Sequence, residues 1–460
     1  MKSVKDICYT LFVLTIKRME PKIMTKLHSK IISYRDQIEV RNRWLNERLD
    51  NLLPDLMRRY DIDCWVVMAR EYNEDPVIMS LLPASMLSCR RTTILVFKMI
   101  NDELKCYNFS RSSIQPFYES AWTNPKGITW PGFEGKVFST DPESNFEGDE
   151  TQFQCLSRVL GELNPINIAL NYSDDYAFSD GLSHALYKQF KESIPNHLTD
   201  RIISAEKLCI AWLETRIESE LAAYTGIVEI AHEIIKEAFS SKVIIPGVTT
   251  NTDVKYYMMQ KVIDLGLQPW FDYETSIIRQ GVRGLGQDTV IMPGDILHCD
   301  VGLKYLGLCT DTQHNAYVLK LDEEDVPEGI KALQKDLNRL QDITLSMFEE
   351  NKTGNEILSL SRKKAIEEGL EPCIYTHPIG YHGHGAGPTI GLWDMQEGVD
   401  GKGDYSLNNN TLYALELNIL STIPEWDDQE VLLGGETNIL FKDGKTYYIG
   451  GRQENLYLIK

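Results

Sequence analysis

The chain has 460 residues, 43% hydrophobic and 25% charged, which is the composition of an ordinary folded protein. Its 67 acidic residues outnumber the 47 basic ones, and the formal net charge is −20. A chain this acidic is a poor match for nucleic acid or for an anionic membrane surface. At this length we expect two domains, or one very large one.

The first 29 residues are expected to form an N-terminal tail. The stretch MKSVKDICYTLFVLTIKR has a basic start and an apolar run, as an export signal has, but no small-residue cleavage site follows. Met24 offers a second start. No apolar run is long enough to predict a transmembrane helix. The nine cysteines lack CxxC pairing, which favours free thiols and a cytoplasmic protein, with export as the alternative.

Residues 30–205 are predicted to form an α/β domain. Residues 30–60 have apolar positions at helical spacing, and the strand-like runs DIDCWVVMA, TTILVFK and INIALNYS alternate with helical patterns. A second domain, residues 206–460, is expected to begin with a long helix in LETRIESELAAYTGIVEIAHEIIKEAF, whose apolar residues mark one buried face.

The second domain contains a weak internal repeat. Two predicted helical hairpins, one running to DLGLQP and the other to EEGLEP, each end in Gly-Leu-x-Pro and are followed by strand-like sequence. Gly266 and Gly369 fit the position just after a helix, with proline shortly beyond. This pattern predicts a duplicated α-α-β-β unit around one sheet, although two helical hairpins can also look alike by chance.

Two aspartates stand in the otherwise apolar stretch HCDVGLKYLGLCTDTQ. The runs on either side of KYLG read as two strands of a hairpin. If the hairpin folds about its midpoint, Asp300 and Asp311 lie opposite each other, where like charges repel unless a cation lies between them. Two solvated turn aspartates are the alternative at this point.

Further candidate ligands follow in the same domain. HPIGYHGHGAGPTIGLWD holds His377, His382 and His384, and glycines flank His384 on both sides. Glu416 in TLYALELNIL and Glu436 in VLLGGETNILF lie in strand-like runs, where a carboxylate is costly unless it is paired or metal-bound. Each glutamate alone is also explained as an edge residue. The whole set is oxygen-rich with one imidazole, which suits Mn²⁺, Zn²⁺, Fe²⁺ or Co²⁺, and its size implies two ions.

In order and spacing, Asp300, Asp311, His384, Glu416 and Glu436 resemble the Asp–Asp–His–Glu–Glu ligand set of the pita-bread metallopeptidases. That family includes aminopeptidase P, prolidase, methionine aminopeptidase and creatinase. MPGDILHCDVG and GHGAG match its motifs, and residues 30–205 resemble the smaller, creatinase-like domain more weakly. The resemblance implies an α+β pita-bread catalytic domain and an Xaa-Pro aminopeptidase-like exopeptidase.

By position, the resemblance implies that Asp300 holds one metal ion, that His384 and Glu416 hold a second, and that Asp311 and Glu436 bridge them. Two ions, with Mn²⁺ favoured over Zn²⁺ or Co²⁺, would supply a bridging hydroxide to attack the first peptide bond. Glu416 is assigned the proton shuttle.

The sequence also departs from the family. RQGVRGLGQ has Arg283 near the place of one usual histidine, and TIGLWD has Trp393 and Asp394 near the place of another. His377 and His382 are therefore candidate catalytic groups, with structural packing as the alternative. Arg283 is a candidate for binding a substrate carboxylate, or else an ordinary surface arginine.

Two other functions compete with the Xaa-Pro exopeptidase. One is a metal-binding family member without peptidase activity, acting as a binding module, which the absent histidines favour. The other is a creatinase-like C–N hydrolase, which in that branch works without metal. The expected partners are a peptide or dipeptide substrate and a second copy of the chain in a homodimer.

Overall fold

The computed structural model describes residues 27–111, 113–122 and 150–460. Contacts divide the described residues into a smaller unit, Tyr34–Leu213, and a larger unit that runs from Glu214 to Lys460 and includes residues 27–33. The domain limit predicted near residue 206 falls at the start of helix α8 (Glu206–Glu214), and the division lies at the end of that helix. The predicted tail, residues 1–29, lies almost wholly outside the described residues.

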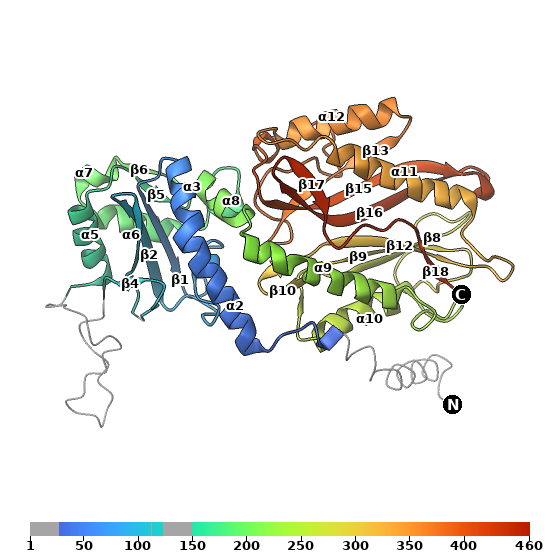
Figure 1. The fold of residues 1–460 in the computed structure, drawn as a ribbon, viewed down its shortest axis with the longest axis horizontal. Helices are drawn as coiled ribbons and strands as arrows, with labels where there is room; N and C mark the ends of the chain where they lie inside the picture. Colours follow the sequence, from blue (N-terminus) through green and yellow to red (C-terminus); the bar gives the residue numbers. More distant parts are fainter. Residues whose placement is uncertain (1–26, 112, 123–149) are drawn as a thin grey trace, which may run out of the picture. The chain divides into compact units, whose positions relative to one another are not determined.

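The smaller unit is built on a six-stranded sheet in the order β4-β3-β2-β1-β5-β6 (Figure 1). The strand β1 is antiparallel to β2 and parallel to β5, so the sheet is mixed. The strands are β1 (Cys64–Arg70), β2 (Thr92–Ile100), β3 (Glu103–Asn108), β4 (Glu119–Ser120), β5 (Ile168–Leu170) and β6 (Ile202–Ser204).

Helices α5 and α6 bury their apolar faces on this sheet. Leu156 and Leu160 of α5 and Phe190 of α6 share one core with alternate residues of β1 and β2. The helices of this unit are α2 (Tyr34–Glu47), a π-helical turn (Arg48–Leu52), α3 (Leu53–Arg59), α4 (Ile78–Leu81), α5 (Gln152–Leu163), a 3₁₀ turn (Ala177–Ser179), α6 (His184–Ser193), α7 (Asn196–Thr199) and α8. The mixed α/β content agrees with the prediction, and β1, β2 and β5 fall in the three predicted strand runs, but β2, β3 and β4 follow one another with no helix among the described residues between them.

The larger unit is built on a nine-stranded sheet. Its main path runs β13-β15-β16-β12-β9-β8, and β14, β17 and β18 pair with β15, β16 and β12. The strands are β8 (Glu274–Ile278), β9 (Ile296–Val301), β12 (Thr312–Val318), β13 (Glu371–Ile374), β14 (His377–Ile379), β15 (Thr411–Ile423), β16 (Gln429–Lys442), β17 (Lys445–Tyr448) and β18 (Tyr457–Ile459). A separate small sheet contains β7 (Gln268–Pro269), β10 (Leu303–Tyr305) and β11 (Leu308–Cys309).

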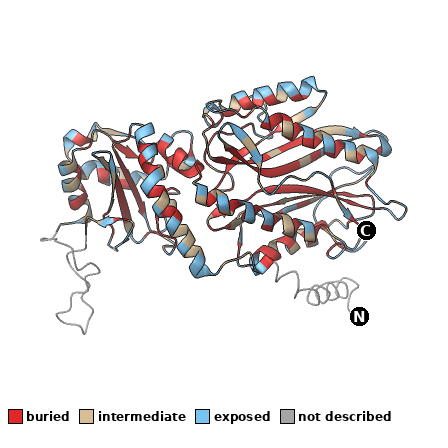
Figure 2. Ribbon diagram, in the orientation of Figure 1, coloured by how far each residue is buried: buried red, intermediate tan, exposed pale blue. Residues whose placement is uncertain are grey.

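Four helices pack on this sheet: α9 (Glu218–Ala238), α10 (Asn251–Asp264), α11 (Glu328–Leu345) and α12 (Gly354–Glu367). Single 3₁₀ turns lie at Lys402–Asp404 and Pro424–Trp426. In β15, Leu415 and Leu417 join the core under α11, and Glu416 between them points to the other face. Figure 2 shows the strands largely buried and the helices exposing one side. The core therefore lies on one face of the sheet, and the other face is left for Glu416.

The two helix pairs have similar ends. Thr250 begins α10 and Thr353 begins α12, each in a reciprocal cap with an acidic residue three positions later. Gly266 and Gly369 follow the two helices with φ of +73° and +84°, a conformation that costs other residues more. Both glycines therefore sit where the sequence predicts them.

The hairpin that carries the two aspartates does not fold about its midpoint. Its turn lies on Leu306 and Gly307, which both have positive φ, one residue beyond the midpoint of the two aspartates. Asp300 is consequently opposite Gln313. The prediction that Asp300 lies directly opposite Asp311 is therefore wrong. A shift of two positions keeps side chains on the same face, so Asp300 and Asp311 remain diagonal neighbours.

No helix in the described part of the chain is long and apolar enough to cross a bilayer. The cysteines within those same residues form no disulfide.

Candidate metal centre

Four carboxylates gather on the inner face of the nine-stranded sheet. Asp300 lies in β9, Asp311 just before β12, Glu416 in β15 and Glu436 in β16. Glu416 of β15 and Glu436 of β16 are directly opposite each other. Gln313 of β12 is opposite Asp300 of β9 on one side and opposite Glu436 of β16 on the other. The adjacent strands thus bring residues more than 130 positions apart into one cluster. Three groups have ligand atoms within 4.8 Å of one another: Asp300, Asp311 and Glu436; His377, Glu416 and Glu436; and Asp311, His377 and His384.

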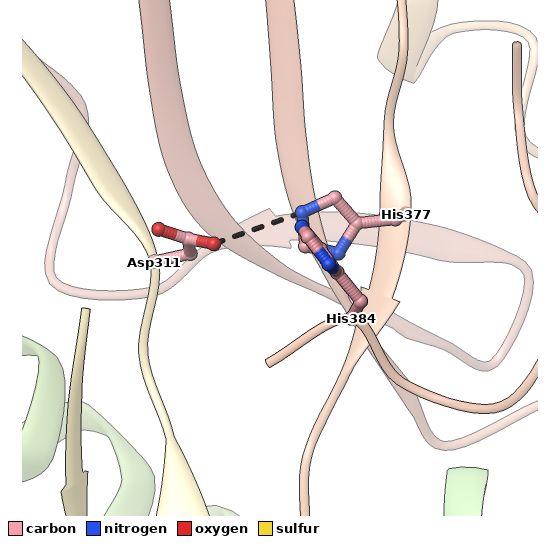
Figure 3. A group of neighbouring side chains, drawn as sticks. All are labelled: Asp311, His377 and His384. Carbon is pink, nitrogen blue, oxygen red and sulfur yellow. Dashed lines mark ion pairs between the residues drawn. The ribbon is translucent and has the colours of Figure 1, made fainter. Parts of the chain in front are cut away.

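His377, at the start of β14, is the imidazole that faces the carboxylates. Its Nε2 lies 3.7 Å from Asp311 Oδ2, 3.8 Å from Glu416 Oε2 and 3.6 Å from Glu436 Oε1. Figure 3 shows the ring pointing at Asp311. Its Nδ1 lies 3.0 Å from the carbonyl oxygen of Pro378, which can only accept a hydrogen bond. The proton is therefore on Nδ1, and Nε2 offers its lone pair to the cluster, as in metal-ligating histidines.

Several buried atoms of the cluster have no hydrogen-bond partner. They are Asp300 Oδ1, Asp311 Oδ1, His377 Nε2 and both carboxylate oxygens of Glu436. An unpartnered buried charge is among the most costly features a protein can carry. Divalent cations would satisfy all five atoms, and oxygen donors with one imidazole are the donors such cations prefer. The residues present therefore fit a metal centre.

Burial sets the protonation of the cluster. It raises the pKa of Asp300 to about 7 and that of Glu416 to about 8, and it raises the pKa values of Asp311 and Glu436 well above their usual range. Burial also lowers the pKa of His377 to about 4, so the ring is neutral at pH 7. Without a cation, the carboxylates reduce their mutual repulsion by binding protons. A bound cation would compete with those protons.

The metal-free protein is expected to lose stability as the pH rises from 6.5 to 8.5. Its carboxylates hold protons up to about pH 7–8, whereas those of the unfolded chain ionise near pH 4, so the folded state binds more protons and stability falls with pH. The buried histidines oppose this only below about pH 6.5, because the unfolded chain protonates its histidines there. The melting temperature of chelated protein should fall by several degrees across this range.

Added Mn²⁺ should raise the melting temperature more at pH 8.5 than at pH 6.5, because cations displace fewer protons there. Chelated Glu416→Gln should show a smaller pH dependence, since one titrating group is removed. A melting temperature that rises with pH in the chelated protein would contradict this description of the cluster.

His384 lies beside His377 on the exposed side of the cluster. The two ring centroids are 4.7 Å apart and nearly perpendicular (Figure 3), and the indole of Trp270 lies 5.3 Å from the ring of His384. A Cβ on Gly383 would come within 2.3 Å of that indole, so only glycine lets the chain pass there. The glycine before His384 therefore serves close packing against Trp270.

The remaining predicted residues lie outside these groups. His382 is half-buried, and burial lowers its pKa to about 4, with smaller contributions from Lys304 and Arg216. Arg283 has 84% of its side chain exposed and lies 3.8 Å from Glu430. Trp393 is 75% exposed, and its carbonyl lies 3.6 Å from the Cys373 thiol. The structure brings none of these three into the carboxylate cluster.

Gln313 is a contact that the sequence reading missed. It is buried in β12, and its Nε2 donates to Glu416 Oε1. A hydrogen bond to an ionised carboxylate favours the charged form, which a metal ligand needs. The only sequence signal was its position two residues after Asp311, because alternation along a strand returns that residue to the same face.

A helix-backed sheet whose free face carries buried acids and an oriented imidazole defines the class of pita-bread metalloenzymes. The chain belongs to metallopeptidase family M24, whose sequence profile matches residues 223–460.

Solved structures with the same fold cover both units. The X-Pro aminopeptidase from Thermotoga maritima is 15% identical with a TM-score of 0.59, and the match covers 88% of this chain and 99% of that one. The Xaa-Pro dipeptidase from Bacillus anthracis is 15% identical with a TM-score of 0.55, covering 93% and 100%. The prolidase from Pyrococcus horikoshii is 15% identical with a TM-score of 0.51, covering 88% and 99%. A comparison with curated protein sequences finds no match.

Proposed function

We propose that the protein is a dinuclear metal-dependent exopeptidase that hydrolyses the N-terminal Xaa-Pro bond of peptides or dipeptides. The observation that carries this proposal is the buried cluster of four carboxylates, three of them within 3.8 Å of His377 Nε2, with its unpartnered atoms. The fold shared with an X-Pro aminopeptidase and an Xaa-Pro dipeptidase supports the choice of substrate class.

The charge of the cluster supports two ions rather than one. Four ionised carboxylates carry four negative charges in a buried site, and two divalent cations balance them. Mn²⁺ is the ion we propose first, because oxygen donors outnumber nitrogen donors. Bound divalent ions would lower the pKa of water and polarise the scissile carbonyl.

We propose a change in the histidine assignment. His377, with its fixed tautomer and its three carboxylate neighbours, is the metal ligand in place of His384, which lies at the exposed edge where a substrate would enter. Asp300, Asp311, Glu416 and Glu436 keep their proposed ligand roles. Glu416, whose Oε1 receives the Gln313 amide, is the group best placed to accept and release a proton from the attacking water.

The other assignments are proposed from position and from family resemblance. Arg283 is exposed enough to reach a substrate carboxylate, and His382 lies in the same loop as His384. The symmetric strand order about β16 and β12, together with the matching ends of α10 and α12, supports an internal α-α-β-β duplication. The creatinase-like character of the smaller domain and the homodimer are proposed by family resemblance.

The test is hydrolysis by protein that has been stripped with chelator and restored separately with Mn²⁺, Co²⁺ or Zn²⁺. The substrates are Xaa-Pro dipeptides and Xaa-Pro-Yaa tripeptides, with Xaa-Ala peptides as matched controls. We expect metal-restored cleavage of the proline-containing peptides, and the preferred length distinguishes a dipeptidase from an aminopeptidase. Two bound ions without cleavage of any proline peptide would favour the binding module, which the exposed Trp393 in place of a family histidine supports.

A further inference from the structure

Asp311 holds its carboxylate in place through the main chain. The residue lies between β11 and β12, outside both strands, and its Oδ1 has no hydrogen-bond partner. Its Oδ2 faces His377 at 3.7 Å, beyond hydrogen-bond length. Its other side-chain neighbours are Asp300 and Glu436, whose ionised oxygens can only accept hydrogen bonds, so the position of this carboxylate depends on how firmly the backbone of residue 311 is held at a break in the strand.

The side chain of Asn438 binds that backbone on both sides. Its Oδ1 accepts from the Asp311 N–H at 3.3 Å, and its Nδ2 donates to the Asp311 carbonyl at 2.6 Å. Nδ2 also lies 3.2 Å from Thr312 Oγ1. The hydroxyl of Tyr224 lies 2.8 Å from Oδ1 and 2.7 Å from the Cys309 carbonyl oxygen, and its single hydrogen is shared between these two acceptors. All four hydrogen-bonding positions of the amide are thus in use.

This arrangement replaces a missing piece of sheet. An amide side chain offers the same donor and acceptor as a peptide group, so Asn438 gives Asp311 the two bonds that a neighbouring strand would give. Asn438 is fully buried and lies two residues after Glu436 in β16, on the same face. One strand therefore supplies both a proposed ligand and the support for another.

We propose that Asn438 is a positioning residue that fixes Asp311 for metal binding, with Tyr224 fixing the orientation of the amide. The inference rests on the proposed metal centre. Groups that orient metal ligands from behind typically contribute 10–100-fold to metal affinity.

The experiment compares Asn438→Ala with Asn171→Ala. Asn171 is a buried amide in the smaller unit that bonds Trp65 and Asp75, so its loss costs stability without touching the cluster. Affinity of chelated protein for Mn²⁺ is measured by calorimetry, and the visible absorption of the Co²⁺ form reports ligand geometry. We expect Asn438→Ala to weaken Mn²⁺ binding at least about tenfold and to alter the Co²⁺ spectrum. Asn171→Ala should change neither.

If Asn438→Ala does not fold, the inference is tested with Tyr224→Phe, which removes only the hydroxyl group. It should weaken Mn²⁺ binding about fivefold, the effect of losing one hydrogen bond. The inference would be overturned if folded Asn438→Ala, or Tyr224→Phe, kept the Mn²⁺ affinity and the Co²⁺ spectrum of the unmodified protein. Absence of metal binding by the unmodified protein would instead overturn the proposed metal centre, so the two failures are distinguishable.

Discussion

Replacing Asp311 with alanine is expected to abolish metal-dependent hydrolysis of Xaa-Pro peptides. Asp311 belongs to two of the three candidate ligand groups, and it is the residue proposed to bridge the two ions. Its removal takes away one quarter of the negative charge of the cluster and one shared ligand. Since bound metal contributes several kcal/mol to such reactions, kcat/KM should fall at least about 10³-fold.

The measurement is steady-state kinetics with saturating Mn²⁺, together with metal content after dialysis. Asp322→Ala is a suitable control, because this exposed aspartate lies in the same unit and away from the candidate groups. If the Asp311→Ala protein folds and keeps full activity, the proposed role of Asp311 as the bridging metal ligand is wrong.

The second large effect distinguishes the two neighbouring histidines. His377→Ala should lose at least one metal ion and lower kcat/KM by at least about 100-fold, because it removes a proposed direct ligand from a site where even supporting groups contribute 10–100-fold. His384→Ala should keep both ions, since its ring lies at the exposed edge, and should act mainly on KM.

Metal content and kinetics of both variants are measured side by side, so each is the control for the other. The reverse pattern, with metal lost only in His384→Ala, would restore the assignment made from sequence resemblance.

The carboxylates could be predicted from sequence because each stands in an apolar or strand-like stretch of sequence, where an unpaired buried charge is costly. The choice between His377 and His384 as the proposed metal ligand could not be predicted from the sequence. GHGAG drew attention to His384, whereas the orientation of His377 depends on the Pro378 carbonyl and on strand pairing with Ala414. Neither contact leaves a mark in the sequence.

The supporting amides were missed for a similar reason. Gln313 and Asn438 are neutral side chains in strands, and their roles depend on which strands pair and in which register. The hairpin shows how sensitive register is: a turn one residue further along moved the partner of Asp300 by two positions. The face of each aspartate was predictable from alternation, but its exact partner was not.

The most direct test of the account is anomalous scattering from crystals of the protein soaked in Mn²⁺. We expect two manganese peaks within coordination distance of the cluster, one on the side of Asp300 and one on the side of His377, with Asp311 and Glu436 between them. Manganese peaks elsewhere in the molecule, with none among these residues, would contradict the proposed dinuclear centre.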